Sequence, residues 1–345
     1  MIDPANALRI VWHAIRSADH PLLAHLVVTR RCNLSCSYCN EYDNSSPPVP
    51  LDALKMRVKR LAELKTLMIA CTGGEPLLHP EISEVIREIR LQGMVAMITT
   101  NGYLLTEELV EILNEAGLQA LQVSIDNVEP DETSAKSLAI LNTKLQLLVE
   151  RARFKVNINS VLGASEASAA DVVAIARRAR HLGFSHSVGF VHDARGALRP
   201  LGPPERLAYD GLGKVSDSFL HRFNRRVFQG KVINGRPGMW KCRAGARYLY
   251  VCEDGLVHWC SQRRGQPAIP IERYGLAGIQ AGFRTRKSCS PFCTVTCVRQ
   301  VSAFDRWRGR QGLPDAESTG RQVERVGLVS AAAVVVRDCQ KEKQV

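Results

Sequence analysis

Residues 22–39, LLAHLVVTRRCNLSCSYC, combine a short apolar run with three closely spaced cysteines. The run 22–29 is rich in Leu and Val, which is typical of strands buried on both faces. Cys32, Cys36 and Cys39 follow it directly in the pattern C-x3-C-x2-C. Three thiolates without a fourth Cys or His nearby suit an iron–sulfur cube with one open iron better than a four-ligand structural zinc. The stretch therefore predicts a cluster-binding loop at the carboxyl end of a buried strand.

The next part of the chain alternates between two kinds of pattern. Further apolar, strand-like runs occupy residues 66–71, 95–100, 121–126, 154–161 and 185–191. Amphipathic, helix-like stretches occupy residues 51–64, 81–91, 106–116, 135–149 and 169–182. Six βα units predict a parallel sheet with right-handed crossovers. The pattern fits an open doubly wound sheet or a partial (β/α) barrel, and in both the ligands bind at the carboxyl ends of the strands.

Polar and glycine residues follow three of these strands. Thr72-Gly73-Gly74-Glu75-Pro76 comes after the second, Thr99-Thr100-Asn101-Gly102 ends the third, and Ser124-Ile125-Asp126 ends the fourth. Glycines allow a close approach of backbone groups to a ligand. We therefore expect these segments to meet the cysteine loop at one end of the sheet.

The cysteine loop and these segments together resemble the radical S-adenosylmethionine (SAM) enzymes, over about residues 22–200. The resemblance implies that Cys32, Cys36 and Cys39 bind a 4Fe–4S cluster, with Tyr38 at the family's aromatic position. The family's reduced cluster cleaves SAM to a 5′-deoxyadenosyl radical, which abstracts hydrogen from a substrate. The segments that match the family's SAM-contacting positions are Gly73, Gly74 and Glu75 for the methionyl end, and Thr100, Asn101, Ser124 and Asp126 for the ribose and methionine.

A second group of cysteines lies between residues 242 and 297. Cys242-x12-Gly255-x4-Cys260 is similar to the opening of the SPASM or twitch extension, in which a hairpin presents cysteines to an auxiliary 4Fe–4S cluster. Glu253-Asp254-Gly255 is a strong hairpin signal. Cys289, Cys293 and Cys297 follow with x3 spacings, which depart from a full SPASM pattern, so we expect one auxiliary cluster.

Several alternatives for this second group stay open. The spacing does not decide which of Cys289, Cys293 and Cys297 complete the set with Cys242 and Cys260, and Cys252 could join it. A single helix would place Cys289, Cys293 and Cys297 on one face, where they could be core. A structural zinc site is the main rival to a cluster.

The expected fold is α/β: a partial (β/α)6 TIM-like barrel with a smaller C-terminal iron–sulfur domain, twitch- or SPASM-like, that contains a β-hairpin. We expect an N-terminal helical segment at 1–21, the barrel at 22–200, a helical linker to about 228 followed by the cluster domain at 201–313, and a tail at 314–345. Residues 231–238 are expected to form a loop, and Cys339 falls in the tail. Because only about 20 residues precede the barrel in this sequence, we expect no leader-peptide-binding domain before it.

The charge distribution and the cysteine content restrict the possible cellular compartment and binding partners of the protein. Residues 1–200 hold 21 Lys and Arg against 22 Asp and Glu, whereas residues 201–345 hold 25 against 12, so the net charge of +12 lies in the second part. In a reducing cytosol, clustered cysteines point to metal binding rather than to disulfides. No apolar run reaches the roughly 20 residues of a membrane span and no secretory signal is present. We expect a cytoplasmic protein.

The substrate and the general acid or base are not identified by the sequence. The basic second part favours an anionic metabolite or lipid headgroup, with a peptide as the other option. A non-catalytic iron–sulfur or zinc protein that binds nucleic acid through this part is the alternative function, although no nucleic-acid motif accompanies the charge. We expect an electron donor such as flavodoxin or ferredoxin. Candidate acid–base or cavity residues are Tyr42, Tyr103, Asn157, Asn159, His186, His192 and Asp193.

Overall fold

The structure is a computed structural model that describes residues 4–39, 41–163, 169–192, 198, 201–215 and 229–308. The chain divides into two units, Met1–Gly309 and Arg310–Val345. All described residues belong to the first unit. Asp193, the segment 216–228 of the expected helical linker, the expected tail and Cys339 lie outside the described residues.

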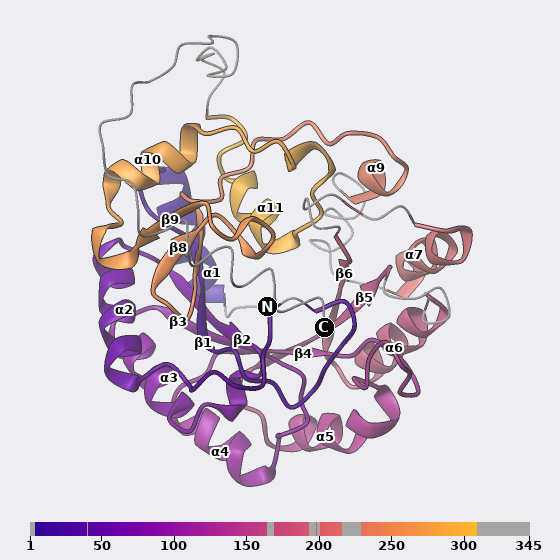
Figure 1. The fold of residues 1–345 in the computed structure, drawn as a ribbon. Coiled ribbons are helices and arrows are strands. Elements are labelled where there is room, and N and C mark those ends of the chain that lie inside the picture. Colours follow the sequence, from indigo (N-terminus) through magenta and orange to yellow (C-terminus); the bar gives the residue numbers. More distant parts are fainter. Residues whose placement is uncertain are drawn as a thin grey trace. The chain divides into compact units, whose positions relative to one another are not determined.

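A nine-stranded sheet organises the first unit (Figure 1), with the strand order β6-β5-β4-β3-β2-β1-β7-β8-β9. The strands β1 to β7 pair in parallel, and β8 and β9 add antiparallel pairs. The strands are β1 Leu23–Thr29, β2 Met68–Gly73, β3 Val95–Thr100, β4 Ala120–Ser124, β5 Lys155–Leu162, β6 Ser185–Phe190, β7 Tyr248–Val251, β8 Leu256–His258 and β9 Pro267–Pro270.

Helices connect the parallel strands and, in Figure 1, α2 to α6 lie along the outer side of the sheet. Side-chain caps begin two of them: Thr106 accepts a hydrogen bond from Leu109 N in α4, and Ser137 accepts one from Ile140 N in α5. The α-helices are α1 Pro4–Arg16, α2 Leu51–Glu63, α3 Ile82–Leu91, α4 Glu107–Glu115, α5 Leu138–Arg151, α6 Ala169–His181, α7 Pro203–Val215, α9 Gly230–Ile233, α10 Leu276–Arg284 and α11 Thr296–Ala303. Short 3-10 turns are η1 Pro76–Leu78, η3 Ser261–Arg263, η4 Ile271–Arg273 and η5 Ser290–Phe292.

The six βα units and the partial barrel are confirmed. Strands β1 to β6 follow one another across the sheet without a reversal of order, as in a barrel, whereas a doubly wound sheet changes direction at a switch point. The expected loop at 231–238 is wrong at its start, because α9 continues to Ile233. The predicted hairpin is present as β7 and β8.

Alternating side chains along β1 serve two separate cores. On β1, Ala24, Leu26 and Val28 pack in the outer core against the helices, while Leu23 and Val27 belong to an inner cluster. The inner cluster also contains Tyr248 and Tyr250 of β7, together with Cys242, Cys252 and Cys260. The inner side of the barrel sheet therefore leads directly to the second group of cysteines.

Strand β7 connects the predicted second domain to the barrel. It pairs in parallel with β1, from Leu23 opposite Tyr248 to Leu26 opposite Val251. The hairpin consequently extends the barrel sheet instead of forming a sheet of its own. The domain boundaries expected from the sequence remain predictions.

A buried ion pair fastens the N-terminal helix to this region. Arg247 Nε donates to Asp305 Oδ2 at 2.7 Å, and both side chains are fully buried. The other guanidinium nitrogens of Arg247 donate to the carbonyls of Ala14 and His20. Arg308 also pairs with Asp305, at 2.6 Å. One carboxylate thus pairs with two guanidinium groups.

We expect Asp305→Asn to lower the free energy of unfolding by about 3 kcal/mol, because it leaves the buried Arg247 without its counter-charge. Chemical denaturation at neutral pH measures this change. The control is Glu63→Gln, which removes an exposed partner of Arg60 and should cost at most about 0.5 kcal/mol. Equal effects of the two substitutions would contradict the structural role of Asp305.

Candidate functional site

The cysteine loop follows β1 and is held by close backbone contacts with the end of β2. Gly74 N donates to Thr29 O at 2.9 Å, and Glu75 N donates to Arg31 O at 2.8 Å. A Cβ atom on Gly73 would lie 1.9 Å from Thr29 O, and one on Gly74 would lie 2.2 Å from Arg31 O. Both positions therefore need glycine because the two chain segments touch. The sequence had instead suggested that these glycines allow the close approach of a ligand.

Glu75 joins the end of β2 to the end of β3. Its carboxylate is fully buried and accepts hydrogen bonds from Leu77 N at 3.0 Å, Thr100 Oγ1 at 2.7 Å and Asn101 N at 2.7 Å. Burial raises the pKa of Glu75, and these donors oppose the shift. The side chain of Glu75 thus orders the edge on which the cysteine loop rests, and it brings Thr100 and Asn101 beside that loop.

Two thiols of the loop lie beside polar groups of the segment after β3 and of the segment after β4. Asn101 Nδ2 lies 3.8 Å from Cys32 Sγ, and Cys36 Sγ lies 3.5 Å from Ser134 Oγ. Burial raises the pKa of Cys32 and of Cys39, and the neighbouring thiols add to this effect. Because metal ligation stabilises thiolates, a bound cluster would offset this cost.

A charged network fixes Tyr38. The Tyr38 hydroxyl donates to Asp126 Oδ2 at 2.5 Å, and Lys136 Nζ lies 2.5 Å from the same hydroxyl and 2.9 Å from Asp126 Oδ2. Ser134 Oγ donates to Asp126 Oδ2 at 2.8 Å. Burial by itself would lower the pKa of Lys136, but the adjacent Asp126 carboxylate raises it above its usual value. The other oxygen of Asp126, Oδ1, is buried without a hydrogen-bond partner.

A cavity of about 320 Å³ opens beside the loop. Its lining comes from the loop itself and from the segment that connects β4 to α5. The lining residues are Cys32, Asn33, Leu34, Ser35, Asn44, Asp131, Glu132, Thr133, Ser134 and Ala135.

Five cysteines of the second group converge. Burial, together with the thiols of Cys242, Cys289 and Cys297, raises the pKa of Cys260 to about 12. Burial also raises the pKa of Cys293, and the thiols of Cys242, Cys260 and Cys289 add to this effect. The proposal of a single helix for the last three is wrong, since η5 spans Ser290–Phe292 and α11 begins only at Thr296. All five therefore contribute thiols to one region.

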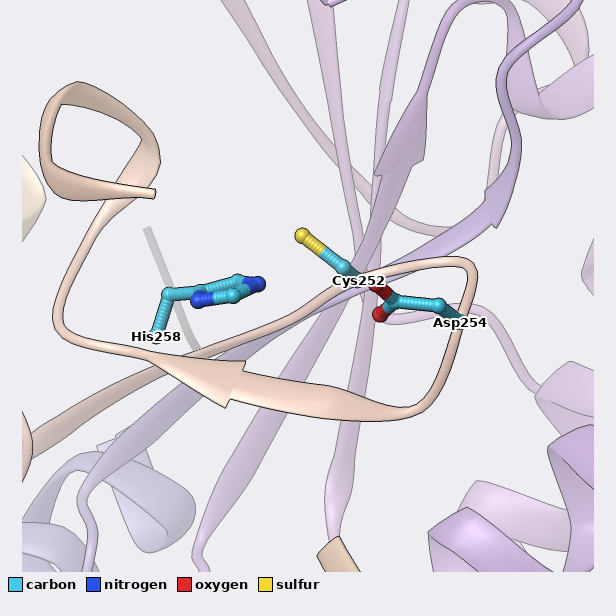
Figure 2. Close-up of side chains that lie close together, drawn as sticks. All are labelled: Cys252, Asp254 and His258. Carbon is cyan, nitrogen blue, oxygen red and sulfur yellow. The ribbon is translucent and has the colours of Figure 1, made fainter. Parts of the chain in front are cut away.

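Cys252 does not belong to that set. Its ligand atom lies within 4.8 Å of those of Asp254 and His258, and Figure 2 shows the three side chains gathered at the β7–β8 hairpin. Gly265 N donates to His258 Nδ1 at 3.0 Å, so the neutral ring carries its proton on Nε2. A metal-bound histidine instead donates its second ring N–H outward. We therefore interpret this trio as a hydrogen-bonding group and not as a metal site.

The loop that follows Cys39 reaches the same hairpin. The Tyr250 hydroxyl donates to Glu41, and Arg30 pairs with Glu253 at 3.2 Å. Arg264 pairs with Glu253 at 3.1 Å. These contacts connect the first cysteine loop to the strand and turn that lead into the second set.

The other predicted polar residues are engaged within the chain. Their contacts are Tyr103 Oη to Ala135 O at 2.6 Å, His186 Nε2 to Ser160 Oγ at 3.1 Å, His192 Nε2 to Thr294 Oγ1 at 2.8 Å, Asn157 Nδ2 to Ser187 Oγ at 2.8 Å and Ser187 Oγ to Asn159 Oδ1 at 2.9 Å. Ser124 ends β4 and is half-buried, and Tyr42 is half-buried in the loop after Cys39. Asn157 and Asn159 face away from the helix-side core of Val156 and Ile158. They therefore give the inner side of β5 a neutral, hydrogen-bonding surface.

Lys136, Ser134, Glu41 and Tyr250 were missed by sequence reasoning. Lys136 lies ten residues after Asp126, in a polar segment without a recognisable spacing. Glu41 and Tyr250 are 209 residues apart in the chain. No local pattern marks such pairs, and only the fold brings them together.

The fold and the loop define a (β/α) barrel with three thiols at the carboxyl ends of its strands. Residues 26–192 match the family model described as the Radical SAM superfamily. The chain thus carries a radical SAM domain over these residues, and the predicted resemblance is confirmed. A radical SAM domain implies SAM and a 4Fe–4S cluster as cofactors.

Curated relatives match over short segments. GTP 3',8-cyclase of Microcystis aeruginosa is 40% identical over 110 residues, which are 29% of this chain and 33% of that protein. AdoMet-dependent heme synthase of Methanosarcina barkeri is 35% identical over 120 residues, and the match covers 34% of each chain. PqqA peptide cyclase of Bradyrhizobium diazoefficiens is 34% identical over 112 residues, 32% of this chain and 30% of that protein. The chain therefore spans about a third of the length of these relatives.

Solved structures share the fold at low sequence identity. Streptococcus suis SuiB bound to precursor peptide SuiA has a TM-score of 0.58 at 16% identity, covering 81% of this chain and 69% of SuiB. Native anSMEcpe with bound AdoMet and Cp18Cys peptide has a TM-score of 0.54 at 18% identity, covering 79% and 83%. Both likenesses extend beyond the barrel. Among the described residues, no helix has the length and apolar character to cross a bilayer.

We expect Lys136→Met to lower the free energy of unfolding by about 3 kcal/mol, because Asp126 stays buried without its partner. Adding Asp126→Asn to this variant should recover part of the loss, since the unpaired charge is then removed. Denaturant titrations of the wild type, both single variants and the double variant give the coupling energy. Strictly additive effects would contradict a direct charge pair.

Proposed function

We propose that the protein is a radical SAM enzyme. Cys32, Cys36 and Cys39 would hold a 4Fe–4S cluster that, with bound SAM, supplies one electron and a 5′-deoxyadenosyl radical for hydrogen abstraction. The observation that carries the proposal is the three-thiol loop held against the Gly73–Glu75 segment inside a barrel of this superfamily. The chain contributes three thiols and leaves one iron of a cube open.

The other contacts of the cysteine loop indicate what individual side chains of the protein would do. Tyr38 is held by Asp126 and Lys136, which orients the loop from one side. Asp126 Oδ1 is a buried acceptor without a partner, so it is available to a hydroxyl or ammonium donor of the cofactor. Gly73, Gly74, Thr100, Asn101 and Ser124 remain proposed SAM contacts, while the Glu75 carboxylate acts by positioning Asn101 and Thr100.

We also propose one auxiliary 4Fe–4S cluster on Cys242, Cys260 and two of Cys289, Cys293 and Cys297. A tetrahedral zinc site with Zn–S bonds near 2.3 Å places its sulfurs about 3.8 Å apart. In the described part of the chain, the ligand atoms of Cys252, Asp254 and His258 all lie within 4.8 Å of one another. No three of the five converging thiols lie that close together. Their wider spacing favours a cluster over a single zinc ion.

The proposed substrate class is inferred from the side chains on the inner surface of the barrel. Asn157, Asn159 and Ser187 form a ladder of neutral amide and hydroxyl groups across β5 and β6. This surface suits a substrate with several uncharged hydrogen-bonding groups, such as a peptide, better than a strongly anionic metabolite. A small electron-transfer protein such as flavodoxin or ferredoxin would supply the electron.

Anaerobic reconstitution with iron and sulfide, followed by SAM and a strong reductant, tests the radical chemistry. We expect 5′-deoxyadenosine from the wild type and only background from the Cys32→Ala/Cys36→Ala/Cys39→Ala variant, because that variant cannot hold the cluster that reduces SAM. Equal amounts from both would contradict the proposal. So would a wild type that holds its iron yet binds no SAM.

Iron analysis of two matched serine variants tests the auxiliary cluster. The wild type should hold about eight irons per chain and Cys242→Ser about four, because one of two 4Fe–4S clusters is lost. Cys252→Ser should keep about eight, because Cys252 lies outside the converging set. About four irons and one zinc in the wild type would establish the zinc alternative instead.

A further inference from the structure

Helix α1, Pro4–Arg16, presents large apolar side chains to the outside. Leu8 is 72% exposed, Trp12 62%, Ile15 54% and Val11 40%. At 100° per residue, positions 8, 11, 12 and 15 form one continuous stripe on the helix. An ordinary surface helix places polar residues there.

The opposite side of α1 packs against the rest of the protein. Ile10 is 6% exposed and Ala14 is fully buried, and both belong to the inner cluster. Arg9 anchors the helix by donating to Gly93 O at 2.8 Å, and Arg247 and Arg308 donate to the carbonyl of Ala14. The helix is therefore docked on the protein without using its outward stripe.

Two other exposed apolar side chains belong to segments that contact α1. Trp307 is 64% exposed, and its neighbour Arg308 donates to the Ala14 and Ile15 carbonyls at the end of α1. Leu91 is 78% exposed and lies two residues before Gly93, the partner of Arg9. The four exposed side chains of the stripe themselves form an apolar patch on α1, and a contiguous exposed apolar patch marks an interaction surface.

The charges beside the stripe are positive. Arg9 and Arg16 lie on one flank of the helix, and Arg16 stands over the Trp12 ring at 5.9 Å. The helix contains no acidic residue, and the nearest ones in the sequence are Asp3 and Asp19. Asp305, close to the end of the helix, is buried in its pairs with Arg247 and Arg308. The patch thus combines an apolar stripe with a cationic border.

We propose that α1 binds the surface of an anionic membrane, lying in the interface plane with Leu8, Trp12 and Ile15 inserted among the acyl chains. A Trp-containing apolar face flanked by arginines is the pattern of interfacial helices, and arginines contribute attraction to anionic headgroups. A second copy of the chain fits this patch less well. A two-fold interface centred on the stripe would bring the arginines of both copies together.

Vesicle cosedimentation of the full, cluster-reconstituted chain tests this inference. The probes are phosphatidylcholine vesicles with and without phosphatidylglycerol, at low and at high salt. We expect binding only to vesicles with phosphatidylglycerol, weakened by salt. Leu8→Ser/Trp12→Ser should reduce the partition coefficient by about tenfold or more, because less apolar surface is inserted. Arg16→Gln should reduce it by about fivefold.

The matched control is Leu207→Ser on α7, which changes a leucine of similar exposure, 75%, outside the patch and should leave binding unchanged. Unchanged iron content shows that each variant is folded. No binding by the wild type, or equal binding to both kinds of vesicle, would overturn the proposal. A concentration-dependent dimer that Leu8→Ser/Trp12→Ser abolishes, without vesicle binding, would assign the patch to a second copy and would also overturn it.

Discussion

The backbone contact between the end of β2 and the start of the cysteine loop is the constraint on which the site depends. Gly73 and Gly74 pass so close to Thr29 and Arg31 that any side chain would collide with carbonyl oxygens. The buried Glu75 then ties this edge to β3 through three hydrogen bonds. Three thiols that must face one cluster need a loop of defined shape, and here neighbouring strands provide it.

The two groups of cysteines belong to one continuous framework. Strand β7 pairs with β1 in the same sheet, so the strand before the first loop and the strand inside the second group share their hydrogen bonds. Side-chain contacts of Glu41 and Arg30 with the hairpin reinforce this connection. A shared sheet holds the two groups of cysteines at a fixed separation more rigidly than two domains joined by a flexible linker would.

Two buried carboxylates in this protein form ion pairs with defined tasks. Asp305 pairs with Arg247 and Arg308 behind the N-terminal helix, and Asp126 pairs with Lys136 beside Tyr38. Each pair joins segments that are far apart in the sequence. Since an unpaired buried charge is costly, such pairs specify one arrangement of the segments they join.

The sequence by itself determined the barrel, the first cysteine loop and the hairpin, because strand and helix periodicity, cysteine spacing and an Asp-Gly turn are local signals. Only the tertiary structure decided why Gly73 and Gly74 are glycines, that Lys136 completes the site of Tyr38, and that Cys252 stands apart from the converging thiols. It also showed that the hairpin extends the barrel sheet. These features depend on contacts between residues tens to hundreds of positions apart, and such contacts leave no periodic or spacing signal in a single sequence.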